Sequence, residues 1–346
     1  MAAVFLSGTL KDNFTLKRVF INLLLIALLL LFWACAGGGG VPKAAKPFKT
    51  ENVIVVVIDG PRHSENWGNT PGLIPFMSGK LKSKGTYFSD FQNNGYTYTN
   101  SGHVAITTGV NQPIDNYGDE LPANPSYFQH WLKKTGSPAN KAWMVMSKDK
   151  LYILANTTDS VWHNQYMPSV NAGVSGPGSG YRMDSATIAE AKQVLARHRP
   201  NLMLINLMEP DGYAHAGNWD NYLRGIARSD KYVEELWDYI RKDKHYKKTT
   251  ALLITNDHGR HLDGIDGGWM EHGDDCAGCR RISLLAVGPD FNKRKTISDM
   301  HSLVDIPATI APILGIKLEN GQGKVIRELF RSKAQKRLDA EAQAVQ

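Results

Sequence analysis

The stretch Ala251–Gly259 combines a buried-strand pattern with an acid–imidazole pair. Its apolar residues predict a strand, and Asp257 and His258 follow at the point where that strand ends. A carboxylate beside an imidazole is typical of sites for divalent transition metals, zinc above all. Strand ends also carry aspartate for turn formation, so the pair alone is a weak signal. The signal becomes stronger because other predicted strands in the chain also end in an aspartate.

Two further apolar runs end in the same kind of residue. Asp59 follows the β-branched run 52–58. Asp211 follows the apolar run 201–208, and His215 comes four residues later. Because one helical turn brings residues four apart to the same side, Asp211 and His215 can bind one ion together.

Thr99, at a hydroxyl-rich helix start, and His272, in a Gly-rich segment, complete a set that can hold two ions. The first predicted site consists of Asp59, Thr99, Asp257 and His258, and the second consists of Asp211, His215 and His272. The second site leaves a position open for water or substrate, as catalytic zinc requires. Two ions about 4 Å apart stabilise in-line displacement at phosphorus. The predicted cofactor is therefore a pair of divalent ions, zinc by preference, with Thr99 as the nucleophile.

Strand and helix patterns alternate along the chain and predict an α/β fold, with a mainly parallel sheet and helices on both faces. The predicted strands are 52–58, 87–91, 141–147, 201–208, 251–254 and 282–287. The predicted helices are 73–84, 125–134, 184–199, 220–241 and 304–314, and a further helix begins near Thr99. Pro307 and Pro312 are expected to interrupt the helix 304–314. In open α/β sheets, ligands bind at the carboxyl ends of the strands. The predicted ligands all lie at or near such ends.

No mid-chain linker divides the chain, so we expect one catalytic domain over residues 51–320. Residues 156–180, rich in Asn, Gly, Ser and Pro, are interpreted as a long surface insertion near the mouth of the site. Residues 321–346 are expected to form a basic, peripheral C-terminal helix or tail. Residues 1–36 and 37–50 are predicted to be an export signal and a flexible tether.

The export prediction depends on the apolar run Ile21–Trp33, which follows Lys17 and Arg18 and is too short for a comfortable membrane span. Cys35 then resembles the lipidated cysteine of bacterial lipoproteins. We therefore expect a periplasmic or outer-membrane lipoprotein that contacts the membrane only through this anchor. Cleavage to a secreted soluble protein and an uncleaved anchor are the alternatives.

The remaining composition restricts partners only broadly. The net charge of +7 is modest, and no basic block with interleaved aromatic residues indicates binding to a nucleic-acid polymer. No pattern addresses the oligomeric state. Cys276 and Cys279 are expected to form a local disulfide, because the expected compartment is oxidising. Three basic residues near strand ends could bind substrate but are interpreted as solvated surface charges: Arg62, Lys148 and Arg260.

The chain resembles the alkaline phosphatase superfamily in the order of its motifs. These are Asp-Gly-x-Arg, Thr-x-x-Gly-His, Asp-x-x-x-His, Asp-His-Gly and a later His-Gly. Within that superfamily, the chain looks most like the type I phosphodiesterase/nucleotide pyrophosphatase branch, with some likeness to cofactor-independent phosphoglycerate mutases and to sulfatases. The resemblance extends over roughly residues 50–316. It implies a two-zinc core and a covalent phosphothreonine intermediate on Thr99.

The chain departs from that branch next to the nucleophile. The diesterases carry a phosphate-binding Asn where this chain has Gly102, so the resemblance assigns substrate binding to Asn100 or to backbone N–H groups. Ser101 is an alternative nucleophile. The Cys/Ser-x-Pro-x-Arg motif of formylglycine sulfatases is absent, which argues against that branch. No inserted second domain like that of the mutases is visible.

Three functions are consistent with these features. The favoured one is a two-metal hydrolase of phosphate esters, with diesters favoured over monoesters. The second is a transferase that moves a phospho-head group between lipids or glycans with the same nucleophile and ions. The third is a metal-holding, non-catalytic binding lipoprotein, which the intact Thr99 argues against.

Overall fold

The computed structural model describes residues 48–69 and 71–343. The predicted export signal, the lipidation residue Cys35 and most of the tether lie outside the described residues. In the described part of the chain, no helix is long and apolar enough to cross a membrane.

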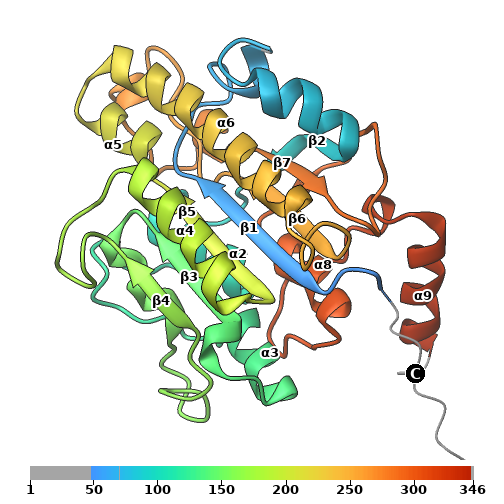
Figure 1. Cartoon of the computed structure of the whole chain (residues 1–346). Helices are drawn as coiled ribbons and strands as arrows, with labels where there is room; N and C mark the ends of the chain where they lie inside the picture. The colour runs from blue at the N-terminus through green and yellow to red at the C-terminus, as the bar shows by residue number, and fades with distance from the viewer. Residues whose placement is uncertain (1–47, 70, 344–346) are drawn as a thin grey trace, which may run out of the picture. The chain divides into compact units, whose positions relative to one another are not determined.

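One mixed sheet forms the centre of the described chain (Figure 1). Its strands follow the order β4-β3-β5-β1-β6-β7-β2-β8, and β9 pairs with β2. The bounds are β1 Asn52–Ile58, β2 Thr86–Gln92, β3 Ala142–Met146, β4 Ser169–Ala172, β5 Leu202–Leu207, β6 Thr250–Thr255, β7 Arg281–Val287, β8 Lys295–Ile297 and β9 His301–Ser302. The neighbours β4, β3, β5, β1 and β6 are parallel, whereas β7 runs antiparallel to β6 and β2. The predicted α/β class with a mainly parallel sheet is confirmed.

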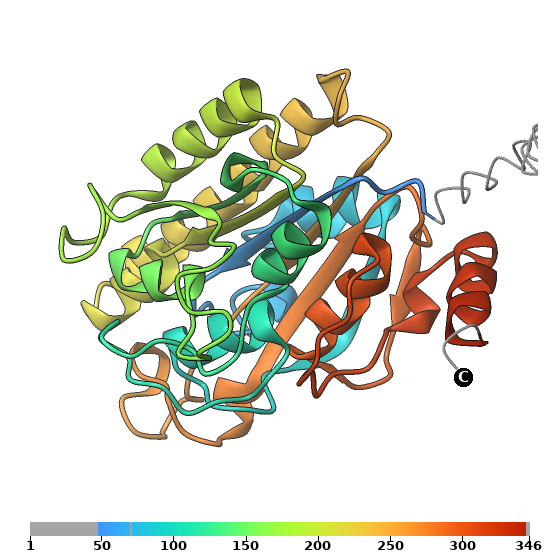
Figure 2. The same cartoon turned by 90° about the horizontal axis from the view of Figure 1, so that it is seen from below.

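Helices cover both faces of the sheet because β1 is apolar on both of its sides (Figure 2). Val55 and Val57 belong to one buried cluster, which includes side chains of α2, α3, α8 and α9. Ile54 and Val56 belong to the other, which includes side chains of α4 and α6. The helix bounds are α2 Thr99–Thr108, α3 Tyr127–Thr135, α4 Asp184–His198, α5 Glu209–His215, α6 Trp219–Lys242, α7 Ala277–Arg280, α8 Asp305–Leu314 and α9 Ser332–Gln343.

The predicted helix over residues 73–84 is wrong in type and extent. The structure has a π-helical turn at Phe76–Leu81, followed by a 3-10 turn at Lys82–Lys84. The Asp230 carboxylate of α6 accepts hydrogen bonds from the backbone N–H groups of Phe76, at 2.9 Å, and Met77, at 2.8 Å. A side chain distant in sequence therefore sets where this segment begins.

Two other segments pack more closely than the sequence pattern indicates. The insertion 156–180 contributes the edge strand β4, which pairs with β3, and its Trp162 is buried against the His130 ring of α3 with 4.4 Å between ring centroids. Part of the segment after residue 320, expected to be peripheral, joins the core instead. Its Phe330 is buried with the ring centroid 5.8 Å from that of Phe48.

The helix predicted to be interrupted by two prolines is continuous. Pro307 lies in the first turn of α8, where a backbone N–H has no helical partner in any case. Pro312 lies inside α8, and the helix continues to Leu314.

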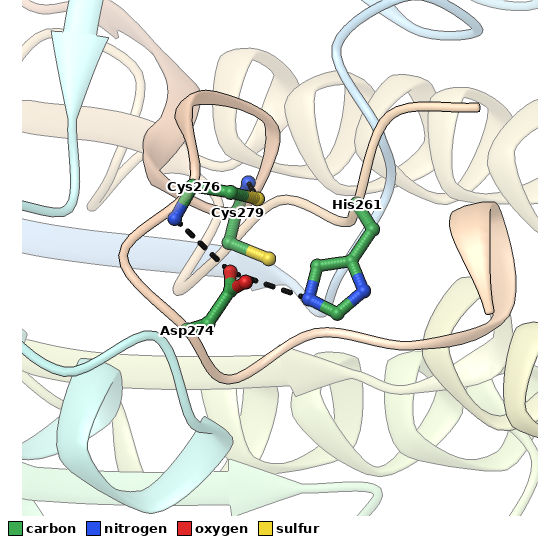
Figure 3. Close-up of side chains that lie close together, drawn as sticks. All are labelled: His261, Asp274, Cys276 and Cys279. Atoms are coloured by element: carbon green, nitrogen blue, oxygen red, sulfur yellow. Dashed lines mark hydrogen bonds and ion pairs between the residues drawn. The ribbon is translucent and has the colours of Figure 1, made fainter. Parts of the chain in front are cut away.

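The predicted disulfide is absent: Cys276 and Cys279 are free thiols. The Cys279 backbone N–H donates to Cys276 Sγ at 3.3 Å, so the first sulfur caps the short helix α7. Both sulfurs lie beside His261 and Asp274 (Figure 3). The sequence spacing alone does not reveal these two neighbours.

Candidate active site

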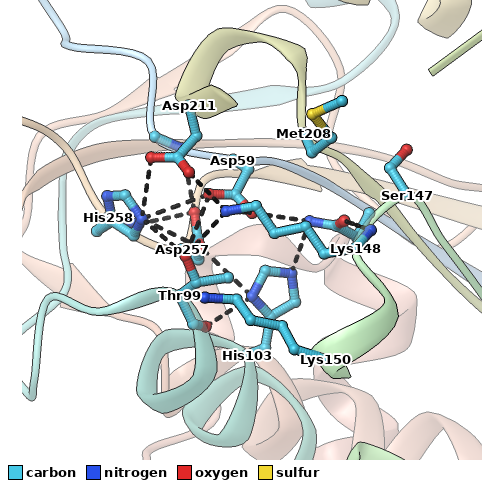
Figure 4. Close-up of polar contacts among 12 residues, drawn as sticks. Asp59, Thr99, His103, Ser147, Lys148, Lys150, Met208, Asp211, Asp257 and His258 are labelled. Carbon is cyan, nitrogen blue, oxygen red and sulfur yellow. Dashed lines mark hydrogen bonds and ion pairs between the residues drawn. The ribbon is translucent and has the colours of Figure 1, made fainter. Parts of the chain in front are cut away.

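Parallel strands deliver three carboxylates to one edge of the sheet. Asp59 follows β1 and Asp257 lies two residues beyond β6, while Asp211 lies in the first turn of α5, just after β5. Since β5, β1 and β6 are adjacent and parallel, their carboxyl ends meet. All three aspartates are buried. Figure 4 shows their carboxylates grouped together.

The first predicted group of ligands lies together. Ligand atoms of Asp59, Asp257 and His258 are within 4.8 Å of one another. Thr99, the first residue of α2, places its Oγ1 3.5 Å from Asp59 Oδ1 and 3.4 Å from His258 Nε2. The threonine hydroxyl therefore faces the carboxylates and the imidazole.

The second predicted group also lies together. Asp211 Oδ1 is 3.3 Å from His215 Nε2 and 3.5 Å from His272 Nε2, and the two imidazole Nε2 atoms are 3.1 Å apart. The rings of His272 and His258 stack with 3.7 Å between their centroids, which joins the two groups. The structure thus brings all seven predicted ligands to one place, and their binding of metal stays a prediction.

Backbone carbonyls set the orientation of two of these imidazoles. His258 Nδ1 is 2.9 Å from the Gly259 carbonyl oxygen, and His272 Nδ1 is 2.8 Å from that of Thr97. A carbonyl oxygen only accepts, so each Nδ1 carries the hydrogen. In the neutral rings, the Nε2 lone pairs therefore point at the carboxylates, an arrangement typical of metal-bound histidine.

The side-chain charges of the site are unbalanced in favour of negative charge. Three buried carboxylates face two buried cationic side chains, Lys148 and Arg260. Asp257 Oδ2 is buried and has no hydrogen-bond partner among the described residues. Carboxylate oxygens and imidazole Nε2 atoms are ligands that zinc accepts. The donor set therefore fits a divalent metal ion.

Lys148 is a site residue that the sequence analysis interpreted wrongly as a solvated surface charge. Its side chain is 1% exposed, and its Nζ lies 3.0 Å from Asp59 Oδ2 and 2.6 Å from Asp211 Oδ2. The same Nζ donates to Thr99 Oγ1 at 3.1 Å. Lys148 lies just after β3, as Asp59 lies just after β1, and this shared position was the signal that could have identified it.

Arg260 and Arg62 are also buried, contrary to the prediction. The Arg260 guanidinium donates to the Asp211 carboxylate and, through Nε at 2.8 Å, to the Gly60 carbonyl oxygen. Arg62 pairs with Glu65 at 2.8 Å and with Asp263 at 2.6 Å. Arg260 therefore orients Asp211, whereas the Arg62 charge is satisfied within the protein.

The sequence analysis assigned no role to two polar residues that lie behind the carboxylates. Asn206 Nδ2 donates to Asp59 Oδ2 at 3.0 Å and lies 3.2 Å from His103 Nε2. His103 Nδ1 is 2.8 Å from the Thr99 carbonyl oxygen and 3.3 Å from Asp257 Oδ2. An asparagine inside the apolar strand β5 was the available signal, because a buried amide requires partners.

The buried cations keep the carboxylates ionised. Burial, the largest single effect, raises the pKa of Asp59 and of Asp211. Lys148 together with His258 at Asp59, and Lys148 together with Arg260 and His215 at Asp211, outweighs burial and lowers both pKa values below the ordinary value. For His258, burial lowers the pKa, but the carboxylates of Asp257, Asp59 and Asp211 together outweigh burial and raise the pKa. Ionised carboxylates are the form that binds metal.

The departure at Gly102 has a steric reason. A Cβ at this position would lie 2.6 Å from the Asp257 carbonyl oxygen and 2.9 Å from its Cβ, so only glycine lets α2 approach the end of β6. The predicted substrate ligand Asn100 is buried, and its Nδ2 donates to the Asp115 carbonyl oxygen at 2.9 Å. Its role in substrate binding stays a prediction.

We expect zinc to stabilise the folded protein through this site. At free zinc about 100 times the dissociation constant, each occupied site adds about 2.7 kcal/mol to the free energy of unfolding, which raises the midpoint of thermal unfolding by roughly 4 °C for a domain of this size. Asp257→Asn should lose a large part of that shift. Asp238→Asn, which changes an exposed aspartate of α6, should keep it. Equal zinc-induced shifts in wild type and Asp257→Asn, measured by calorimetry, would contradict metal binding by Asp257.

Comparisons with known proteins identify a family from the sequence and a fold from the structure. The model of the Sulfatase family matches residues 51–316. A sequence search of curated proteins gives no significant match.

Solved structures of similar fold include three enzymes or enzyme relatives. Murine ectonucleotide pyrophosphatase/phosphodiesterase 5 superposes with a TM-score of 0.59 at 15% identity, covering 81% of this chain and 100% of that chain. An alkaline phosphatase superfamily protein from Vibrio parahaemolyticus superposes with a TM-score of 0.61 at 14% identity, covering 83% of this chain and 72% of that chain. A phosphonate monoester hydrolase of Agrobacterium radiobacter superposes with a TM-score of 0.58 at 13% identity, covering 81% of this chain and 77% of that chain. At such low identity, these likenesses show the fold alone.

Proposed function

We propose a function on the premise that this chain belongs to the sulfatase family, within the alkaline phosphatase superfamily of phosphate and sulfate ester hydrolases. The proposed activity is metal-dependent hydrolysis of phosphate esters, diesters in preference to monoesters, with Thr99 as the nucleophile. One observation carries the proposal: the Thr99 hydroxyl lies where Asp59, His258 and Lys148 converge.

Two ions are proposed, one held by Asp59, Thr99, Asp257 and His258 and the other by Asp211, His215 and His272. When bound, such ions neutralise charge on the transferring phosphoryl group and lower the pKa of coordinated oxygens. The two clusters of ligand atoms support this assignment.

Thr99 performs the covalent step. Its Oγ1 forms a bond to phosphorus, the bond from phosphorus to the ester oxygen breaks, and the released alcohol takes up a proton. The threonine proton is lost to solvent, because the lone pair of His258 Nε2, 3.4 Å from Oγ1, is assigned to the ion. Lys148 Nζ, beside Oγ1, stabilises negative charge on the transferring group. Water then attacks the phosphothreonine, which releases the product and restores the Thr99 hydroxyl.

Exposed aromatic rings support the preference for diesters. Tyr98 precedes the nucleophile, is 42% exposed, and has its ring centroid 6.0 Å from that of His272. Tyr181 is 45% exposed, with its ring centroid 5.7 Å from Lys148 Nζ. A diester carries a second organic group, and two partly exposed rings beside the site offer apolar surface to bind it.

Sulfate ester hydrolysis is the second candidate, because the family model is that of the sulfatases. The test compares turnover of bis-p-nitrophenyl phosphate, p-nitrophenyl phosphate and p-nitrophenyl sulfate by the zinc-loaded protein. We expect the diester to give the highest kcat/KM. Faster turnover of the sulfate would favour the second candidate, and phosphothreonine that accumulates without an added acceptor alcohol would favour a transferase.

Lys150 is expected to make substrate binding pH-dependent. Burial and the neighbouring Lys148 ammonium lower the pKa of Lys150 to about 8. The charges of Asp59, Asp211 and Asp257 also act on this pKa, which places the Lys150 ammonium near the proposed site. Above pH 8 the ammonium is lost, and the KM for bis-p-nitrophenyl phosphate, which stays a monoanion, should rise about tenfold, the equivalent of one charge-assisted hydrogen bond.

Two variants check this assignment. Lys150→Met should show the high KM at every pH, and Lys150→Arg should keep the low KM above pH 8, because arginine stays charged. A KM profile with the same alkaline rise in Lys150→Met would assign the titration to another group.

A further inference from the structure

A second cluster of metal-binding side chains lies outside the proposed active site. His261, Asp274, Cys276 and Cys279 each place one ligand atom within 4.8 Å of the others (Figure 3). All four belong to the segment that connects β6 to β7. In a tetrahedral zinc site, neighbouring ligand atoms are about 3.3 to 3.8 Å apart, so small movements of the side chains would close this cluster around an ion.

The His261 imidazole is oriented as a ligand. Its Nδ1 lies next to the Asp266 carbonyl oxygen, which only accepts, so Nδ1 carries the hydrogen. Its Nε2 is buried, has no hydrogen-bond partner among the described residues, and lies 3.2 Å from Asp274 Oδ1. In the neutral ring this places a lone pair against a carboxylate oxygen that already accepts from the Cys276 N–H at 3.0 Å, and a cation between the two atoms would engage the lone pair that has no donor.

A disulfide would use only part of this arrangement. It would join the two sulfurs and leave the buried imidazole nitrogen facing the Asp274 carboxylate unsatisfied. A metal ion would engage all four groups. The two cysteines are separated by two residues, a spacing common among zinc ligands.

We propose that His261, Asp274, Cys276 and Cys279 bind a structural zinc ion that is separate from the ions of the active site. Four protein ligands close the coordination sphere, which is the pattern of structural rather than catalytic zinc. Binding releases two protons from the thiols, and the two thiolates, the carboxylate and the neutral imidazole hold the dication with a net charge of −1. This inference does not depend on the proposed ester hydrolysis.

The proposed ion would stabilise the segment that carries His272. The Asp274 carbonyl oxygen accepts from Thr97 Oγ1 at 2.7 Å, and the Thr97 carbonyl oxygen accepts from His272 Nδ1. At the other end, Gly259 N–H donates to the Cys279 carbonyl oxygen at 2.7 Å. An ion bound between His261 and Cys279 would therefore join both ends of the loop that brings His272 to Asp211.

Cobalt substitution tests the site without any measurement of turnover. The reduced full-length protein is loaded with Co²⁺, and its absorption is compared with that of Cys276→Ser/Cys279→Ser. We expect a thiolate-to-cobalt charge-transfer band in the wild type and its loss in the double variant, together with one metal ion fewer per chain. The ligands proposed for the active site are oxygen and nitrogen atoms, so they give no such band.

Matched variants separate the two sites. Cys35→Ser and Thr99→Ala should keep the band, and Asp274→Asn should keep it with lowered zinc affinity, because one ligand is lost but both thiolates remain. The wild-type spectrum is decisive even if the double variant does not fold. Reduced wild type without the band, or thiols oxidised to a disulfide in the protein as isolated, would overturn the proposal.

Discussion

Thr99→Ala is expected to lower kcat/KM for bis-p-nitrophenyl phosphate by at least about 10³-fold, because the covalent route has no other nucleophile in place. The fold should tolerate the change, since Thr99 is the first residue of α2 and alanine is a good helix former. Zinc content should be close to that of the wild type, since Asp59, Asp257 and His258 remain. Turnover measured on zinc-loaded protein, with the metal content determined in the same sample, provides the check.

Ser101→Ala is the matched control for this prediction. Ser101 is buried on the same helix two residues later, and its hydroxyl has no hydrogen-bond partner among the described residues. If Thr99 is the nucleophile, Ser101→Ala keeps most of the activity, and acid-quenched wild type carries the phosphoryl group on Thr99. Activity that is lost in Ser101→Ala but retained in Thr99→Ala would show that Ser101, and not Thr99, is the nucleophile.

Lys148→Met is expected to impair both catalysis and folding. Loss of one preorganised group that stabilises the transition state costs about 10² to 10³ in kcat. The same change leaves Asp59 and Asp211 buried without the ammonium that lies 3.0 and 2.6 Å from them. Removal of one partner from a buried ion pair lowers the free energy of unfolding by about 3 to 5 kcal/mol. Urea denaturation in the presence of a chelator measures the folding effect without metal.

The folding effect of Lys148→Met should depend on pH in a defined direction. In the wild type, Lys148 keeps the folded-state pKa of both aspartates below the ordinary value, so its stabilisation is present at neutral pH and is lost as pH falls through the folded-state pKa. In the variant, burial is opposed by fewer positive charges, so the folded-state pKa of each aspartate lies higher than in the wild type. The stability difference between wild type and variant should therefore shrink as pH falls below the unfolded-state pKa of about 4.

Lys150→Met is the control for stability. Lys150 Nζ donates to the Asn116 carbonyl oxygen at 2.9 Å, which is a neutral acceptor, so its removal should change the free energy of unfolding by about 1 kcal/mol or less. Equal destabilisation by the two substitutions, or no pH dependence for Lys148→Met, would show that the buried ion pairs do not act as described.

The sequence determined the fold class and the set of candidate ligands. Runs such as 52–58 are apolar without alternation, which requires a parallel strand buried on both faces. Aspartates just beyond such runs must then meet at one edge of the sheet, because the strands are parallel. The convergence of Asp59, Asp211 and Asp257 follows from this rule, although the sequence contains no direct information on their distances.

The tertiary structure alone decided the state of the basic residues and cysteines. A lysine is exposed by default, and Lys148 is buried only because carboxylates from β1 and α5 surround its ammonium. Cys276 and Cys279 have the spacing of a local disulfide, but His261 and Asp274 reach them only through the fold of the loop between β6 and β7. Local patterns specify strands and turns, whereas the charge and coordination of a side chain depend on neighbours that are distant in sequence.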